Sequence, residues 1–103
     1  MLTTFIESLA ALWEKTYHFT APPNTEPTYI VWTEDGGNDL KANNRHAEKI
    51  TTGTLDLFVR YETDPLIQRI PAFLNNFPVA YSLVSVSYEE ETGFLHYSWD
   101  WEV

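Results

Sequence analysis

The chain has 103 residues and a mass of 11.9 kDa, the size of one compact domain, so we predict a single domain over residues 1–103. Six basic against fifteen acidic residues give a net charge of −9, which argues against direct DNA binding through neutralised phosphates. The absence of cysteine excludes disulfides and thiolate metal sites, and the 44% of apolar residues argues against intrinsic disorder.

The composition also bears on where the protein works. The first residues lack the basic start and the apolar run of a secretion signal, and no stretch reaches about 18 apolar residues. We therefore expect a soluble protein of the cytosol with no role in a membrane.

The N-terminal segment carries apolar residues at helical spacing from Leu2 to Tyr17, with the polar residues mostly off that stripe. This pattern predicts an amphipathic helix that ends before the prolines at positions 22 and 23, because adjacent prolines cannot continue a helix. Thr4 and Glu7 have the spacing of a capping box, which places the start of the helix at Thr3 or Thr4.

The segment Tyr29–Thr33 is rich in β-branched and aromatic residues and predicts a short strand. From Asp35 to about His46 the chain is polar, which predicts a long loop. The start of this loop lacks the alternating acids and the closing glutamate of a calcium-binding loop, so we interpret it as a turn. Long loops in compact domains are usually functional or mobile.

A second strand is predicted where apolar and polar residues alternate; it begins as early as Lys49, with Gly53 as a bulge or bend. Its buried face is expected to hold Leu55, Leu57, Val59 and Tyr61.

A second helix is predicted after Asp64, a capping carboxylate that precedes a proline at the first helical position. Apolar residues recur at helical spacing as far as Phe77. Because Pro71 removes one backbone hydrogen bond, we expect a kinked helix or two short pieces.

The C-terminal part predicts an antiparallel hairpin that turns over residues 89–93. Its core-facing residues are expected to be Val84, Val86, Tyr88, Leu95, Tyr97, Trp99 and Trp101. Regular alternation would then turn Tyr81, Leu83 and Phe94 outward. The predicted fold is α+β, a four-stranded, mostly antiparallel sheet with two helices on one face, in the order α-β-β-α-β-β.

The polar residues carry no signal for catalysis. His18, His46 and His96 have no shared ligand spacing, and we interpret them as exposed or hydrogen-bonded rather than metal-binding. The sequence has no GxSxG motif, no cysteine nucleophile and no glycine-rich phosphate loop. We therefore expect a protein that is not an enzyme and has no catalytic residue, cofactor or metal.

The second face of the predicted sheet is partly apolar, because Phe58 stands there beside Arg60. A half-apolar face and open sheet edges both favour association with another copy of the chain. The acidic run Glu89, Glu90 and Glu91 is either a solvated turn or an acidic rim presented to a partner or to DNA.

The element order, the short strand Tyr29-Ile30-Val31-Trp32, the stretch from Ile50 to Pro65 that joins a strand to a helix through Asp64, and the ending Tyr97-Ser98-Trp99-Asp100-Trp101-Glu102-Val103 form one pattern. Over nearly the whole chain this pattern resembles the tail-terminator, or tail-completion, proteins of long-tailed bacteriophages.

The resemblance implies a structural protein that forms a ring of six copies on the end of the finished tail tube. Such a ring stops tube polymerisation and supplies the surface that docks to the head. The implied partners are the chain itself, the tail-tube protein and the head-connector protein, while DNA passes through without specific binding. The implied location is the tail–head junction of the virion, and the host cytoplasm during assembly.

We expect contacts between subunits or with the tube at the polar loop and on the second sheet face. The residues are Asp35, Asp39, Lys41, Asn43, Asn44, Arg45, His46, Phe58 and Arg60. A loop without order or partner is the alternative for positions 35–46.

Two other classes of protein remain open. An acidic DNA mimic would fit the charge, although the acids are scattered rather than set in a spaced double row. A small-molecule-binding domain would need a pocket, for which Trp32, Tyr97 and Trp99 are the candidate lining residues.

Overall fold

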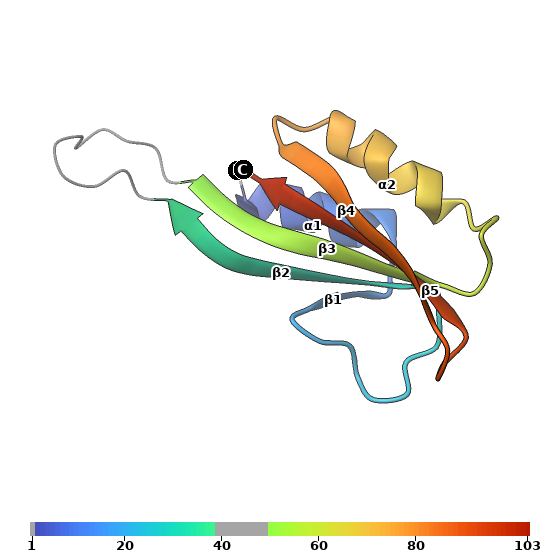
Figure 1. Ribbon diagram of the computed structural model, residues 1–103. Helices are drawn as coiled ribbons and strands as arrows, with labels where there is room; N and C mark the ends of the chain where they lie inside the picture. The colour runs from blue at the N-terminus through green and yellow to red at the C-terminus, as the bar shows by residue number, and fades with distance from the viewer. Residues whose placement is uncertain (1, 39–49) are drawn as a thin grey trace, which may run out of the picture.

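The computed structural model describes residues 2–38 and 50–103. These residues form one five-stranded mixed sheet with two helices on the same face (Figure 1). The elements are α1 (Leu2–Leu12), β1 (Thr16–His18), β2 (Tyr29–Asn38), β3 (Ile50–Val59), α2 (Leu66–Asn75), β4 (Ala80–Glu89) and β5 (Phe94–Glu102). The strand order across the sheet is β1-β2-β3-β5-β4. The α+β class and the placement of the helices are confirmed, but the count of four strands and the predicted element order are wrong.

The fifth strand is β1, in a segment that we expected to be helical. The helix α1 begins at Leu2, one residue before the earlier of the two predicted starts, and it ends at Leu12. Four residues further on, the chain pairs in parallel with β2, so that Tyr17 lies opposite Val31. Threonine, tyrosine and histidine fit a pleated strand at least as well as a helix, and the hydrogen bonds to β2 decide between the two.

The strand β2 is longer than predicted, because residues 34–38 pair with the start of β3 instead of forming a loop. A register shift between Glu34 and Gly36 leaves Asp35 as the extra residue of a bulge. The bulge thus lies in β2 and not at Gly53, which pairs regularly with Glu34 on one side and Trp101 on the other.

The helix α2 is one continuous helix with Pro71 inside it, so the expectation of two pieces is wrong. Its start agrees with the sequence analysis: the Asp64 Oδ1 atom accepts a hydrogen bond from the Leu66 N–H at 2.9 Å. The other carboxylate oxygen of Asp64 accepts from the Thr28 hydroxyl at 2.6 Å. Asp64 therefore joins the start of α2 to the chain that leads into β2.

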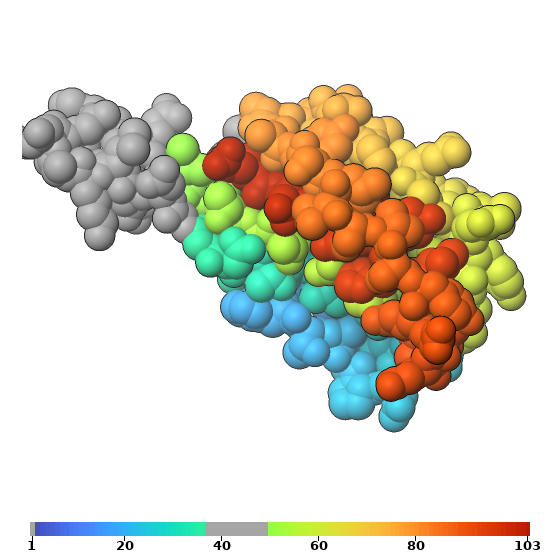
Figure 2. Space-filling model, in the orientation of Figure 1, coloured from blue at the N-terminus to red at the C-terminus, as the bar shows by residue number. Residues whose placement is uncertain are grey.

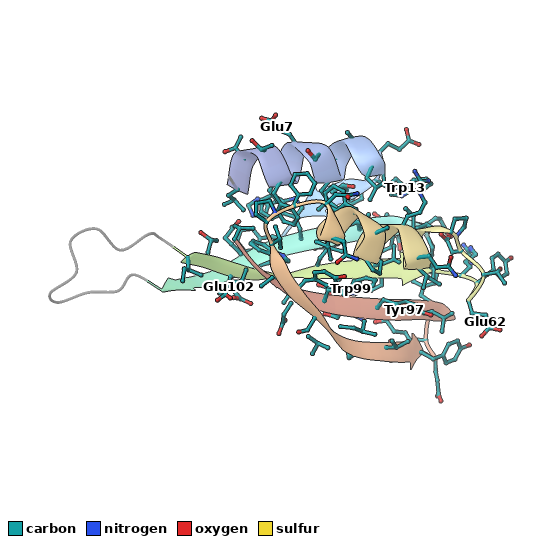
Figure 3. The ribbon with its side chains drawn as sticks, turned by 90° about the horizontal axis from the view of Figure 1, so that it is seen from above. Glu7, Trp13, Glu62, Tyr97, Trp99 and Glu102 are labelled. Atoms are coloured by element: carbon teal, nitrogen blue, oxygen red, sulfur yellow. The ribbon has the colours of Figure 1, made fainter. Side chains whose placement is uncertain are left out.

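The core lies between the two helices and one face of the sheet (Figure 3). Phe5 of α1 is its centre, with ring centroids 5.4 Å from Trp101, 5.8 Å from Phe73 and 5.9 Å from Phe77. The buried positions predicted in β3 and β5 are confirmed for Leu55, Leu57, Val59, Trp99 and Trp101. Leu95 and Tyr97 are only partly buried. The prediction of burial is wrong for Tyr61, which follows the end of β3, and for Val84, Val86 and Tyr88 of β4, all of which are exposed.

Candidate functional site

The strand β4 forms one edge of the sheet, because only β5 pairs with it among the described strands. Figure 2 shows its atoms in orange, exposed over the front of the molecule from α2 to the β4–β5 turn. Four large apolar side chains on this strand are half or more exposed: Leu83 (53%), Val84 (56%), Val86 (50%) and Tyr88 (61%). We call these four residues the apolar β4 surface.

A bulge in β4 decides where these side chains point. The register shifts between Leu83 and Ser85, so Val84 has no partner residue on β5. Leu83 lies opposite Trp99 before the bulge, and Val86 lies opposite Tyr97 after it. Residues directly opposite in an antiparallel pair share a sheet face, so both point to the helix side.

The predicted outward orientation of Tyr81 and Leu83 is therefore wrong, since strict alternation does not continue through the bulge. Tyr81 lies opposite Trp101, and its hydroxyl donates a hydrogen bond to Asn75 Oδ1 of α2 at 2.8 Å. The helix thus covers the beginning of β4 but leaves the strand exposed from Leu83 onward.

The strand offers little protection against pairing with another strand. From Ala80 to Tyr88 it has no charged residue and no proline, the two devices that most often protect an edge. Its outer N–H and C=O groups have no strand partner among the described residues. The edge combines free backbone groups with apolar side chains, which is the arrangement needed for strand addition by a partner.

A cleft of about 640 Å³ lies on the opposite face of the sheet, beneath the coil of residues 19–26. A row of stacked rings from three strands forms its floor. The Phe58 ring centroid is 4.6 Å from that of Tyr29 and 4.2 Å from that of His96. Phe94 also lines the cleft, as expected for a residue on this face. The second face is therefore partly apolar, as the sequence indicated.

Polar groups in the cleft are held in pairs. The Asp56 Oδ1 atom lies 2.7 Å from His96 Nε2, which donates to it, and Glu89 Oε2 lies 3.9 Å from His96 Nδ1. Arg60 pairs with Glu26 of the covering coil, and its guanidinium carbon lies 5.7 Å from the centroid of the Phe94 ring.

The cleft also changes the acidity of one tyrosine. Burial raises the pKa of the Tyr29 hydroxyl above its ordinary value, and the negative charge of Glu89 raises this pKa further. Both effects disfavour the phenolate, so this hydroxyl stays protonated to higher pH than an exposed tyrosine.

The predicted contact residues fall in different places. Phe58 and Arg60 line the cleft, and Glu89 ends β4 beside His96, while Glu90 and Glu91 are exposed in the turn. Asp35 lies in the β2 bulge, where its Oδ1 atom accepts from the Thr52 hydroxyl at 3.0 Å. The remaining predicted positions lie outside the described residues: Asp39, Lys41, Asn43, Asn44, Arg45 and His46.

The pocket considered from the sequence does not form where we expected it. Trp99 is buried in the core, and the cleft beneath residues 19–26 is not lined by Trp32, Tyr97 or Trp99. Trp32 instead stacks on His18, with ring centroids 3.9 Å apart, and His18 Nε2 lies 2.8 Å from Glu34 Oε1.

Sequence reasoning missed the covering coil and the exposure of β4. Glu26 and Arg60 are 34 positions apart in the chain, and no local spacing relates them. The uncharged run from Ala80 to Tyr88 was a signal for an unprotected edge, but only the strand order places it at an edge.

Comparison with models of known protein families finds no match, and comparison with curated proteins finds none either. Within the described residues, no helix is long and apolar enough to cross a membrane. The same residues contain no group of three or more histidine, cysteine or acidic side chains arranged to hold a metal ion.

Proposed function

We propose that this chain is a structural subunit that forms a ring on the end of a bacteriophage tail tube, stops growth of the tube and provides the docking surface for the head. The observation that carries this proposal is the apolar β4 surface on an unprotected edge strand. Exposed apolar side chains beside free backbone groups favour an interface with another chain. A ring requires such an interface between each subunit and its neighbour.

The charge of the chain supports the same role. At −9 per copy, six copies would carry −54, and an acidic bore would repel DNA phosphates. The genome would then slide through the ring without binding to it. A ring with a basic or neutral bore would contradict this part of the proposal.

The test is the mass of the assembled protein, measured by light scattering over a wide range of protein concentrations, alone and with tubes of the cognate tail-tube protein. We expect growth toward a closed ring of 11.9-kDa chains, and electron microscopy of the tubes should show a cap at one end. A strict monomer under both conditions would contradict the proposal.

Substitution Val86→Lys should abolish assembly, because it places a charge within the apolar β4 surface. Val86 is half exposed, so the folded monomer should tolerate the change. The matched control is Ala11→Lys, which makes the same charge change at an exposed position on α1. If both variants assemble as the unchanged chain does, β4 does not form the interface between subunits.

A further inference from the structure

The cleft beneath residues 19–26 is separate from the apolar β4 surface. Its floor consists of side chains on the sheet face that carries no helix, whereas Leu83, Val86 and Tyr88 point to the helix side. Its volume of about 640 Å³ is in the range of clefts that bind ligands, roughly 300–1,000 Å³. A second kind of contact can therefore be made here without using β4.

One carboxylate on the floor has an oxygen available to a ligand. The Asp56 Oδ1 atom is taken by His96 at 2.7 Å. The Oδ2 atom has the Thr54 hydroxyl 3.5 Å away, which is too long for a strong hydrogen bond, and it has no closer donor among the described residues. The Asp56 side chain is 21% exposed, so a cationic group that reached Oδ2 would form a charge-assisted bond in a partly desolvated site.

The surroundings of Asp56 favour a positive ligand. Glu89, Glu90 and Glu91 form the turn beside the cleft. The positive charge of Arg60 is already offset by Glu26. The net charge of −9 would attract a basic partner from solution and speed the encounter.

The aromatic side chains suit the rest of such a ligand. Phe19 and Phe94 both line the cleft, and Phe19 is 61% exposed. Long basic side chains pack their aliphatic stems along apolar surfaces of this kind, with the charged end at a polar group.

We propose that this cleft binds an extended basic segment of a partner protein, with one lysine or arginine side chain placed against Asp56. The partner is identified by its chemistry: positive side chains separated by small or apolar residues. The contact forms on a single chain and does not require a ring.

The test is an NMR titration of the isotope-labelled chain with an acetylated pentapeptide of alternating glycine and arginine. Amide shifts should concentrate on residues that line the cleft, and a peptide with citrulline in place of arginine should not bind. Asp56→Asn should weaken binding about tenfold, the size expected when a hydrogen bond to a charged group is lost. Asp100→Asn makes the same charge change on the same sheet face outside the cleft, and should weaken binding by less than about twofold.

Equal weakening by the two variants would overturn the proposal, because binding would then depend on net charge alone. Binding of the citrulline peptide, or shifts centred away from the cleft, would overturn it as well. If Asp56→Asn does not fold, peptide binding is compared between Glu26→Gln, which lies at the cleft, and the control Glu62→Gln, which is exposed outside it. Only the cleft variant should weaken binding. Failure of ring assembly would leave each of these results unchanged.

Discussion

Gly53 lies where the sheet leaves no room for a side chain. A Cβ atom at this position would collide with the backbone oxygen of Thr33 and with the indole of Trp101. Gly53→Ala should therefore lower the free energy of unfolding by about 1–3 kcal/mol, the usual cost of overpacking. Urea unfolding followed by tryptophan fluorescence measures this change.

Gly36 provides the matched control for Gly53. A Cβ atom there would lie 3.4 Å from the Thr52 hydroxyl oxygen, and the position is exposed. Gly36→Ala should change the free energy of unfolding by no more than about 0.5 kcal/mol. Equal losses in the two variants would show that the close approach of Trp101 to Gly53 does not limit substitution.

The raised pKa of Tyr29 predicts a loss of stability at high pH. The folded chain holds this proton more tightly than the unfolded chain, so the stabilisation is complete below the unfolded pKa, about 10, and is lost as the pH rises through the folded value. Absorbance titration should show one late-ionising phenol, which is missing in Tyr29→Phe.

The cause of the Tyr29 shift can be divided by one substitution. Glu89→Gln removes the smaller cause and leaves burial, so the late phenol should ionise earlier but still above the ordinary tyrosine value. Glu91→Gln, in the exposed turn, is the control and should leave the titration unchanged. No response to Glu89→Gln would exclude the charge as a cause.

At the scale of elements, Asp64 connects α2 to the coil before β2. One carboxylate oxygen accepts from the Leu66 N–H, and the other accepts from the Thr28 hydroxyl. Asp64→Ala should lower the free energy of unfolding by about 1–2 kcal/mol, as the loss of a helix-capping side chain does. Thermal unfolding measures it, with Glu62→Ala as an exposed control; equal effects would contradict the capping role.

The elements also show which local signals suffice. Alternation in β3 and the aromatic pattern in β5 predicted their buried faces correctly, because both strands lie in the middle of the sheet and pack regularly. Alternation failed in β4, where the bulge at Val84 moves Tyr81 and Leu83 to the other face. A three-residue strand such as β1 has no periodicity that can be read from sequence, and it exists because β2 is beside it.

The whole molecule carries −9, and this charge opposes self-association. Salt shortens the screening length from about 8 Å at 0.15 M to about 3 Å at 1 M, so ring formation through an apolar interface should strengthen as salt is added. Sedimentation velocity at low and high salt measures the mass. A ring that dissociates as salt is added would instead mean that ion pairs stabilise the interfaces between its subunits. Binding of the basic peptide in the cleft should weaken over the same range of salt.

Also at this scale, only part of the candidate site was accessible from sequence. Phe58 and Arg60 were named because they stand on the face opposite the buried side chains, and both line the cleft. The covering coil was not foreseen, since its contact with Arg60 comes through Glu26, a residue distant in the chain. Positions 39, 41 and 43–46 stay predictions.

The amino-acid sequence by itself determined the α+β class, the two helices, the burial of β3 and the core tryptophans, and the acidic charge. These properties follow from composition and from periodicity along single elements. The tertiary structure decided that β4 lies at an edge, that β1 joins the sheet, and that His96 lies beside both Asp56 and Glu89. These properties depend on pairing between segments that are distant in the chain. The local preferences of residues that are adjacent in the sequence do not reveal such pairing.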